Sequence, residues 1–466
     1  MSDEFNASIE NLFDPALSKA TRFAKGTEIR KTTPRSAHQQ WNIPEKRRDP
    51  IEILIETNIG RIETLLPIRY QRMMESPFAF FRGAAAIMAE DLAHTPNSGI
   101  HLQLCGDCHL MNFGGFATPE RKLVFDINDF DETYPGPWEW DLKRLSTSFA
   151  IAGKWRNFSD KHCKEFAWHT ADSYKRHMLD YSHLSALQIW YADIDLSELI
   201  EMGEDEEIKK FHLKRIKKAS EYTAHEKEFA KMTYQQGPRA RIKDEPPLIY
   251  HPTIREEEEV LKAAEKAHIL YIESLSDDKK ILLSRYKLHD IAIKVVGVGS
   301  VGTMCGITLL MSATGEPIFL QFKEARKSVL EANLKNKSKY THQGERIVIG
   351  QKLMQSASDM FLGWTSDDQN RFFYIRQLRD AKVKPVLEIM KSDNMIDYAK
   401  SCGWALARAH ARSGDPSVVS GYIGKGNEFA DAIAKFSMAY AAQNEIDYTK
   451  MLEAIKEGRL PIAPDV

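Results

Sequence analysis

The pattern of hydrophobic and polar positions changes several times along the chain, and each change predicts a different kind of element. Segment 78–92 follows Pro77 and is apolar on nearly all sides of a helical wheel, which is typical of a buried helix. Segment 1–45 is polar and interrupted by prolines, so we expect a mobile arm or a strap packed on the surface. Segment 140–236 and the chain from Asp397 onward are mostly helical in pattern.

Short apolar runs next to glycines predict strands. Such runs occur at 101–105, 122–125, 291–296, 318–322 and 371–378, and 238–252 is expected to be a linker. The order of elements therefore predicts an α+β protein. Its expected parts are an arm at 1–45, a helical lobe at 46–285 that contains loops 104–141, a strand-rich lobe at 286–385, and C-terminal helices at 386–466 that pack on the helical lobe.

Composition limits the binding partners and the cellular location that we expect for the protein. The 466 residues include 64 Lys and Arg against 66 Asp and Glu, so no overall positive charge attracts nucleic acid or an anionic membrane. No segment approaches the roughly 18 apolar residues of a membrane-spanning helix, and the first residues do not form a signal peptide. The five cysteines are odd in number, which favours free thiols. We therefore expect a cytoplasmic protein without nucleic-acid or membrane partners.

Acidic residues are concentrated around two short apolar runs. Asp107 and Asn112 follow the first run, and Asp126, Asp129 and Asp131 follow the second. Carboxylate and amide oxygens are the ligands that Mg²⁺ prefers, and a separate carboxylate can accept a proton from a hydroxyl. The alternative is an exposed acidic turn, but apolar residues are interleaved throughout. The sequence therefore predicts a divalent-metal centre at 104–141.

Two resemblances rest on these motifs. Gly106-Asp-x-His-x-x-Asn112 followed by Asp129-Phe-Asp resembles the catalytic and metal loops of aminoglycoside-phosphotransferase-like kinases. Residues 40–460 as a whole resemble the bacterial family called domain of unknown function 2252. The motifs that carry this second resemblance are Ser76-Pro-Phe-Ala-Phe-Phe-Arg-Gly-Ala, Gly106-Asp-Cys-His-Leu-Met-Asn-Phe-Gly, Asp126-Ile-Asn-Asp-Phe-Asp-Glu-Thr and Gln351-Lys-Leu-Met-Gln-Ser-Ala-Ser-Asp.

The kinase resemblance implies a role for each residue of the centre. Asp107 would be the catalytic base, with His109 as its partner or as a packed side chain. Asn112 would hold a metal, and Asp129 would bridge this metal to phosphate. Asp126 competes with Asp129 for that role, and Asp131 is a further candidate ligand.

A nucleotide lobe is expected downstream of the centre, because nothing before Asp107 supplies one. Gly297, Gly299 and Gly302 form Gly-x-Gly-x-x-Gly between two predicted strands, and Lys323 ends the next strand. Glycines let backbone N–H groups close on phosphate, and the lysine can neutralise it. Glu345 is the expected partner of Lys323, with Glu331 as its rival. Segment 374–378 would contact adenine.

The implied fold is protein-kinase-like and circularly permuted, with the catalytic loops first and the nucleotide lobe second. The implied cofactors are ATP and Mg²⁺ or Mn²⁺, and the expected partners are a nucleotide and an unknown small-molecule or protein hydroxyl acceptor. The implied activity is a phosphotransferase or a nucleotidyltransferase, because transfer of a phosphoryl group and transfer of AMP would use the same residues. Two alternatives to a transferase also remain open. One is a metal-dependent hydrolase that uses Asp107, His109, Asp126 and Asp129 without nucleotide, and the other is a nucleotide-binding pseudoenzyme. Cys105 and Cys108 could form half of a zinc site, but no second ligand pair is evident.

Overall fold

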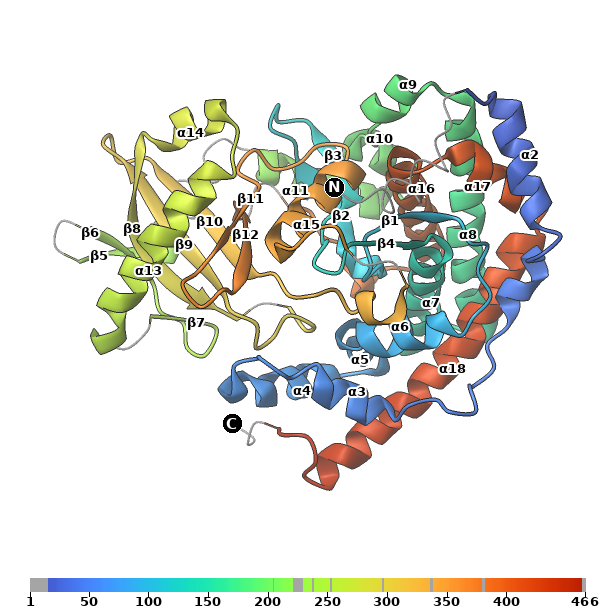
Figure 1. Ribbon diagram of the computed structural model, residues 1–466, viewed down its shortest axis with the longest axis horizontal. Coiled ribbons are helices and arrows are strands. Elements are labelled where there is room, and N and C mark those ends of the chain that lie inside the picture. Colours follow the sequence, from blue (N-terminus) through green and yellow to red (C-terminus); the bar gives the residue numbers. More distant parts are fainter. Residues whose placement is uncertain are drawn as a thin grey trace.

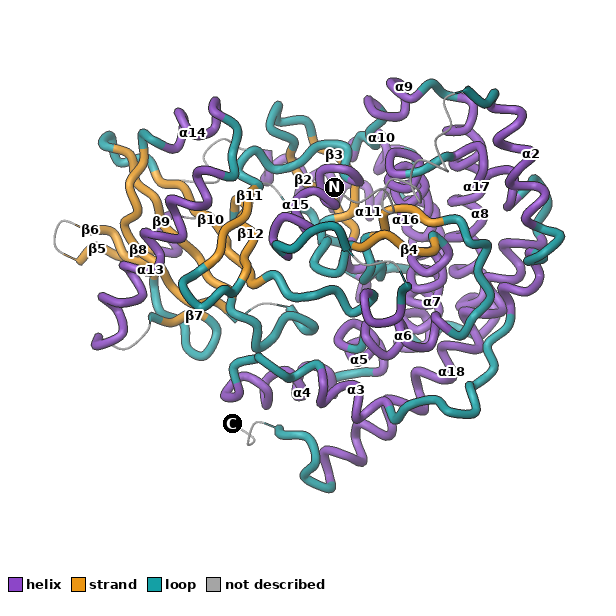
Figure 2. Tube along the Cα trace, viewed as in Figure 1, coloured by secondary structure: helices purple, strands orange, loops and turns teal. Residues whose placement is uncertain are grey.

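The computed structural model describes residues 16–203, 205–220, 229–236, 239–251, 254–295, 297–335, 338–378 and 382–462. The described chain forms two lobes. A sheet with its own helices lies on the left in Figure 1, and a larger helical lobe lies on the right. Figure 2 shows the same division, with most strands gathered on one side and most long helices on the other.

The sheet lobe is built on a six-stranded antiparallel sheet with the order β11-β12-β10-β9-β8-β7. Its strands are β7 (Ile249–Tyr250), β8 (Tyr286–Lys294), β9 (Cys305–Ser312), β10 (Pro317–Glu324), β11 (Gly363–Ser366) and β12 (Phe372–Gln377). The predicted strands at 291–296, 318–322 and 371–378 thus correspond to β8, β10 and β12. Lys323 lies near the end of β10, opposite Cys305 on β9 and Tyr374 on β12.

Alternating side chains bury both faces of this sheet. Leu309 and Phe319 pack with Ile242 of a hairpin formed by β5 (Thr233–Gln236) and β6 (Arg239–Ile242). Leu310 and Leu320, the next residues along, pack on the other face against α13 (Ile254–Glu273) and α14 (Asp277–Leu283). Helix α15 (Gln343–Met354) contacts both β11 and β12.

The helical lobe contains the largest core of the molecule. Its helices are α3 (Pro50–Glu56), α4 (Leu66–Met74), α5 (Pro77–Gly83), α6 (Ala85–Ala93), α7 (Glu139–Trp155), α8 (Asp160–His183), α9 (Ala186–Tyr191), α10 (Leu196–Glu201), α11 (Glu206–Ser220), α16 (Ser392–Ser413), α17 (Pro416–Ile423) and α18 (Glu428–Lys456). Helices α16 and α18 both pack on α8, so the C-terminal helices belong to this lobe as expected.

Two short antiparallel pairs carry the acidic motifs. Strand β1 (His101–Leu104) pairs with β4 (Tyr134–Pro137), and β2 (Phe113–Ala117) pairs with β3 (Leu123–Ile127). The first acidic loop joins β1 to β2, and the second joins β3 to β4. The two pairs therefore bring both loops to one place.

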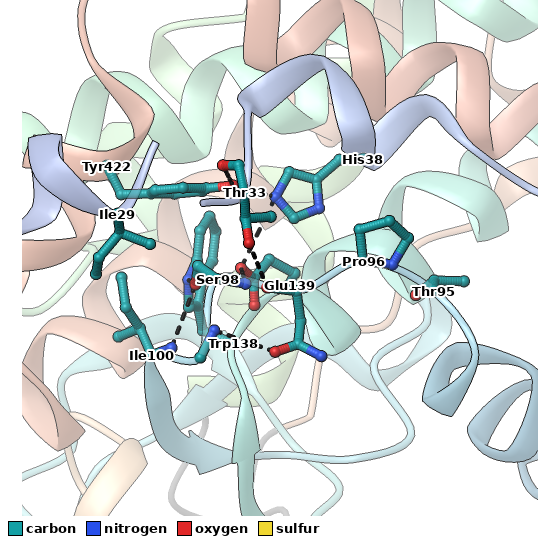
Figure 3. A network of polar contacts seen from close by, with 12 residues as sticks. Ile29, Thr33, His38, Thr95, Pro96, Ser98, Ile100, Trp138, Glu139 and Tyr422 are labelled. Atoms are coloured by element: carbon teal, nitrogen blue, oxygen red, sulfur yellow. Dashed lines mark hydrogen bonds and ion pairs between the residues drawn. The ribbon is translucent and has the colours of Figure 1, made fainter. Parts of the chain in front are cut away.

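The N-terminal segment is a strap in its described part, 16–45. Helix α2 (Lys19–Ile29) packs on α17, and η1 (Arg35–Gln39) packs on α18. Figure 3 shows His38 among buried polar groups of α7, α17 and the loop before β1. Its Nε2 lies 2.6 Å from the Tyr422 hydroxyl, and Glu139 accepts the Ser98 N–H at 2.8 Å. Of the two expectations for the arm, the strap is correct for these residues; 1–15 lie outside the described residues.

Four sequence predictions differ from the structure. The single helix at 78–92 is two helices, because Ala84 has φ −114° and ψ 33°. Carbonyls at the end of α5 accept side-chain N–H groups instead, including that of Phe81 from Arg144 at 3.0 Å. The helix expected to reach 236 ends earlier, and β5 occupies 233–236. The expected linker at 238–252 contains β6 and β7 in its described part. Because α13 and α14 cover the sheet, the sheet lobe begins before the predicted boundary at 286.

No helix among the described residues is long and apolar enough to cross a membrane.

Candidate active site

A cavity of about 630 Å³ contains most of the residues selected from the sequence. Asp107, His109 and Asn112 line it from the first acidic loop, and Asp129 and Asp131 line it from the second. Residues 297–300 of the glycine loop line the same cavity. The fold therefore brings together two motifs that are about 170 to 190 residues apart in the chain.

Close backbone packing fixes the position of Asp107. Gly106 has φ +88°, and a Cβ at this position would lie 2.2 Å from the carbonyl oxygen of Glu132. Only glycine allows the two acidic loops to approach so closely. Asp141, in the first turn of α7, accepts the N–H groups of Cys105 and Gly106 at 2.8 and 3.0 Å. The loop is thus held from both sides.

Arg144 binds the Asp107 carboxylate. Its Nε and Nη2 lie 2.7 and 2.5 Å from Asp107 Oδ1. Burial raises the pKa of Asp107, and the positive charge of Arg144 opposes this rise. The other carboxylate oxygen, Asp107 Oδ2, lies 3.7 Å from His109 Nε2. Asp107 thus keeps one oxygen available to a substrate hydroxyl.

His109 is a buried, neutral imidazole. Burial, with a further contribution from the charges of Arg82 and Arg144, lowers its pKa well below the usual value. Its Nδ1 accepts the Met111 N–H at 3.2 Å, which assigns the proton to Nε2. The ring therefore faces Asp107 with its N–H group and helps to orient the loop.

Asn112 is oriented by its own loop. Its Nδ2 donates to the backbone oxygen of Asp107 at 2.8 Å, which leaves the amide oxygen as an available ligand. Asn112 also lines the cavity.

Asp129 and Asp131 share Lys323. The lysine Nζ lies 3.6 Å from Asp129 Oδ2 and 3.1 Å from Asp131 Oδ2. Burial opposes ionisation of Asp129, but the charges of Lys323 and Arg376 outweigh it and lower the pKa of this carboxyl. Burial and the charge of Asp129 raise the pKa of Asp131. Asp129 is therefore the more firmly ionised carboxylate.

Asp131 also connects the acidic loop to the sheet lobe. Its Oδ1 accepts a hydrogen bond from the Tyr374 hydroxyl, and its Oδ2 accepts one from Ser300 Oγ at 3.4 Å. Ser300 belongs to the glycine loop, so the two predicted motifs are in direct contact.

The glycine loop between β8 and β9 is held by the helical lobe. Gly297 and Gly302 have φ of +69° and +88°, a conformation that favours glycine. Arg72 donates to the Gly297 carbonyl and Arg61 to the Val301 carbonyl. Near Gly299, the Arg82 carbonyl oxygen lies 3.3 Å from the position of a Cβ. The loop thus lies directly on α5.

Asp126 does not join the cavity. Its carboxylate is fully buried and ion-paired with Arg408, whose Nη2 lies 2.9 Å from both oxygens. Ser356 donates to it through both its N–H and its hydroxyl. Asp126 lies within β3 and meets Arg408 of α16, whereas Asp129 follows the strand and lines the cavity. The expectation that Asp126 is a metal ligand is therefore not supported by its position.

Glu345 does not pair with Lys323 in the described structure, and neither does Glu331. Gln343 and Ile347 line the cavity from α15. Arg346, the residue after Glu345, donates to the backbone oxygens of Asp131 and Thr133. Consecutive helical residues point about 100° apart, so the choice of face could not be made from the sequence.

The acidic residues suit a metal that takes only a few ligands from the protein and the rest from phosphate and water. Among the described residues, only Cys105, Cys108 and Asp141 form a group of three potential ligands within 4.8 Å of one another. Asp141 already accepts two backbone N–H groups there, and burial raises the pKa of Cys108 to about 11. Mg²⁺ commonly takes one or two carboxylates plus phosphate and water, so the oxygens of Asn112 and Asp129 fit it.

Several residues of the site were missed in the sequence. Arg144 lies three residues after Asp141, on the same side of α7, and this spacing could have indicated it. Tyr374 belongs to the segment expected near adenine, and its hydrogen bond to Asp131 was not anticipated. Nothing local identifies Arg408 as the partner of Asp126, because 282 residues separate them.

Comparison with known proteins defines the family. The sequence model of the family described as "Uncharacterized protein conserved in bacteria (DUF2252)" matches residues 61–454, which is most of the chain. The protein therefore belongs to this bacterial family. No curated protein and no solved structure matches it.

Proposed function

We propose that the protein is an ATP- and divalent-metal-dependent transferase of kinase-like fold that acts on a hydroxyl group. One observation carries the proposal. The glycine loop and the acidic loops line one cavity, and Ser300 and Lys323 both contact Asp131, which also lines it. A phosphate-binding loop next to ionised carboxylates and a lysine is what nucleotide-dependent group transfer requires.

The order of elements in the sheet lobe supports a kinase-like arrangement. In protein kinases a glycine-rich loop covers the phosphates, and a lysine lies on the third strand. Here the glycine loop joins β8 to β9, Lys323 lies on β10, and α15, β11 and β12 follow. The departure is the order in the chain, since the acidic loops precede this lobe, and Lys323 pairs with Asp129 and Asp131 instead of an acid on α15.

Each residue has a role in the proposed reaction. Asp107 accepts the proton of the acceptor hydroxyl while the oxygen of that hydroxyl attacks phosphorus. The nucleotide leaves with the electrons of the broken P–O bond. Lys323, which contacts Asp129 and Asp131, would neutralise phosphate charge beside them. Backbone N–H groups of residues 297–300 bind phosphate oxygens. Arg144 and His109 hold Asp107 in place.

Asn112 and Asp129 would hold the divalent metal. When bound, Mg²⁺ or Mn²⁺ neutralises the phosphates and orients them. The lowered pKa of Asp129, which follows from the charges of Lys323 and Arg376 despite burial, keeps this ligand ionised.

The hydrolase alternative is less favoured, because it requires Asp107, His109, Asp126 and Asp129 as ligands of one metal. Asp126 is bound to Arg408 outside the cavity. A pseudoenzyme would have the same cavity and would differ only in turnover.

The test is nucleotide binding by the purified protein, measured as thermal unfolding and by calorimetry with ATP and Mg²⁺. Ligand at about 100 times its Kd stabilises by roughly 2.7 kcal/mol, which raises Tm by a few degrees. We expect this rise in the wild type and its loss in Lys323→Met. Lys287→Met, an exposed lysine on β8, is the matched control and should bind normally.

The outcomes separate the candidates. If Mg²⁺ stabilises but ATP adds nothing, the transferase is rejected. If ATP binds, Asp107→Asn should retain binding but abolish turnover of labelled ATP. A wild type that binds ATP without any turnover indicates the pseudoenzyme.

A further inference from the structure

Four arginines line the same cavity as the acidic loops. They are Arg61, Arg69, Arg82 and Arg326, and they come from the turn after α3, from α4, from α5 and from the segment after β10. None of the four forms an ion pair with a carboxylate anywhere in the described chain. They therefore make one part of this cavity positively charged.

Three of these arginines converge on the C-terminal end of α3. The Nε of Arg61 donates to the Thr57 carbonyl at 2.8 Å, and Nη1 of Arg326 approaches the same oxygen at 3.4 Å. Arg69, which is 1% exposed, donates to Thr57 Oγ1 at 3.0 Å and also to Asn58 Oδ1. All of these acceptors are neutral, so the contacts position the guanidinium groups without neutralising them.

Arg82 lacks a polar partner among the described residues. Its guanidinium makes no hydrogen bond or ion pair with any described residue, and its buried Nε is unsatisfied. The nearby charge that acts most on it is that of Asp107. Because the Arg82 carbonyl lies under Gly299, this side chain lies beside both the glycine loop and the catalytic loop.

This arrangement is costly without an anion. Burial and the charges of Arg69 and Arg326 lower the pKa of Arg61 to about 9, so the guanidinium groups repel one another. Glu132 attracts Arg61, but its Oε2 accepts the Val329 N–H, and burial raises its own pKa to about 7. Arg69 is buried and the other three are partly buried, and a cation removed from water is normally paired because its lost hydration is otherwise not replaced.

Arginines elsewhere in the described chain differ in their partners, and one of them, Arg346, donates only to neutral oxygens. Arg47 pairs with Asp91 and Asp447, and Arg408 pairs with Asp126. The cavity differs from these sites in that four arginines without a carboxylate partner among the described residues line one space. Guanidinium groups bind phosphate in bidentate geometry, which makes a phosphoryl group the anion of matching charge and shape.

We propose that Arg61, Arg69, Arg82 and Arg326 form a subsite that binds a phosphoryl group next to the Asp107–Asp129 centre. Two sources have this chemistry, namely the terminal phosphates of the nucleotide and a phosphate carried by the acceptor. The subsite deepens the proposed function by defining its substrate, but binding of a free phosphate compound does not depend on that function.

The experiment titrates inorganic pyrophosphate into the full-length protein by calorimetry, with a chelator present to remove metal. We expect binding by the wild type and a loss of about tenfold in affinity for Arg82→Gln and for Arg326→Gln. Arg82→Gln should remain folded, because its guanidinium makes no hydrogen bond in the described chain. Arg371→Gln is the matched control: this arginine lines the same cavity but is paired with Asp367 at 2.7 Å, so affinity should be unchanged.

A second titration in saturating Mg²⁺ and a non-hydrolysable ATP analogue separates the two sources. Loss of pyrophosphate binding assigns the subsite to the nucleotide's phosphates, and retained binding assigns it to a phosphorylated acceptor. The proposal is overturned if the wild type does not bind pyrophosphate at millimolar concentration, or if Arg82→Gln and Arg326→Gln bind like the wild type. Failure of ATP binding alone would reject the transferase and leave the subsite standing.

Discussion

The acidic residues of the two loops differ mainly in the cations and hydrogen-bond donors that contact their carboxylates. Asp126 has a buried cation, Asp107 has Arg144, and Asp131 has Lys323, a tyrosine hydroxyl and a serine hydroxyl. Glu132 is the exception among the acids of the centre, because it accepts a backbone N–H but has no ion pair among the described residues. Its environment therefore favours the protonated form.

Glu132 should make stability depend on pH. Burial raises its pKa from 4.5 to about 7 in the folded state, so the folded protein binds more protons than the unfolded chain between these values. Stability contributed by this group is present below the unfolded pKa and is lost as pH rises through the folded pKa, with a cost of at most about 3 kcal/mol.

Glu132→Gln should remove that cost, since the amide oxygen can still accept the Val329 N–H. We expect the variant to gain stability relative to the wild type in urea unfolding at about pH 8, and to gain little at about pH 5. Glu63→Gln, at an exposed position in η2 (Glu63–Leu65), is the control and should show no such difference. An equal gain at both pH values would contradict the assignment.

At the scale of elements, the Asp126–Arg408 pair joins three segments. Asp126 lies on β3 and Arg408 on α16, and Arg408 also donates to the Met354 carbonyl at the end of α15 at 2.6 Å. Ser356, just after α15, completes the set. The sheet lobe and the helical lobe are therefore connected through one buried carboxylate.

Asp126→Asn should destabilise the protein by about 3–5 kcal/mol, because it leaves Arg408 buried without its counter-ion. The free energy of unfolding from chemical denaturation measures this. Asp129→Asn is the comparison, since Asp129 is 33% exposed and its loss should change stability by about 1 kcal/mol or less. We expect the opposite order of effects on metal binding. Asp129→Asn should weaken Mg²⁺ binding, and Asp126→Asn should not. A stable Asp126→Asn variant with weakened Mg²⁺ binding would show that Asp126 is a ligand after all.

At the scale of the whole molecule, ion pairs connect the segment after the strap to the last helix. Arg47 lies just after the strap and binds Asp91 of α6 and Asp447 of α18, 400 residues away. Both carboxylates are nearly inaccessible, at 3% and 2% exposure of their side chains. This junction fixes the last helix against the segment that precedes α3.

Arg47→Met should therefore cost about 3–5 kcal/mol, because two buried carboxylates lose their cation. Tm should fall by several degrees, with nucleotide binding unchanged in the protein that remains folded. Arg48→Met is the adjacent control. Arg48 is 41% exposed and pairs with Glu56 and Glu90 on the surface, so its loss should cost about 1 kcal/mol or less. Similar losses in both variants would contradict the proposed junction.

The sequence by itself determined the elements that depend on local pattern. The alternation in β8, β10 and β12, the glycine loop between strands, and the acidic loops after β1 and β3 were all readable, because periodicity and turn residues act within about 20 residues. The family was also evident from motifs such as Gly106-Asp-x-His-x-x-Asn112.

Only the tertiary structure decided which charges meet. It placed Asp126 with Arg408 instead of a metal, turned Arg346 instead of Glu345 toward the acidic loop, and left Arg82 without a hydrogen-bond or ion-pair partner among the described residues. These outcomes depend on the rotation of each helix and on contacts between residues hundreds of positions apart. Electrostatic energies vary with burial and with a few ångströms of separation, and neither quantity is encoded in local sequence spacing.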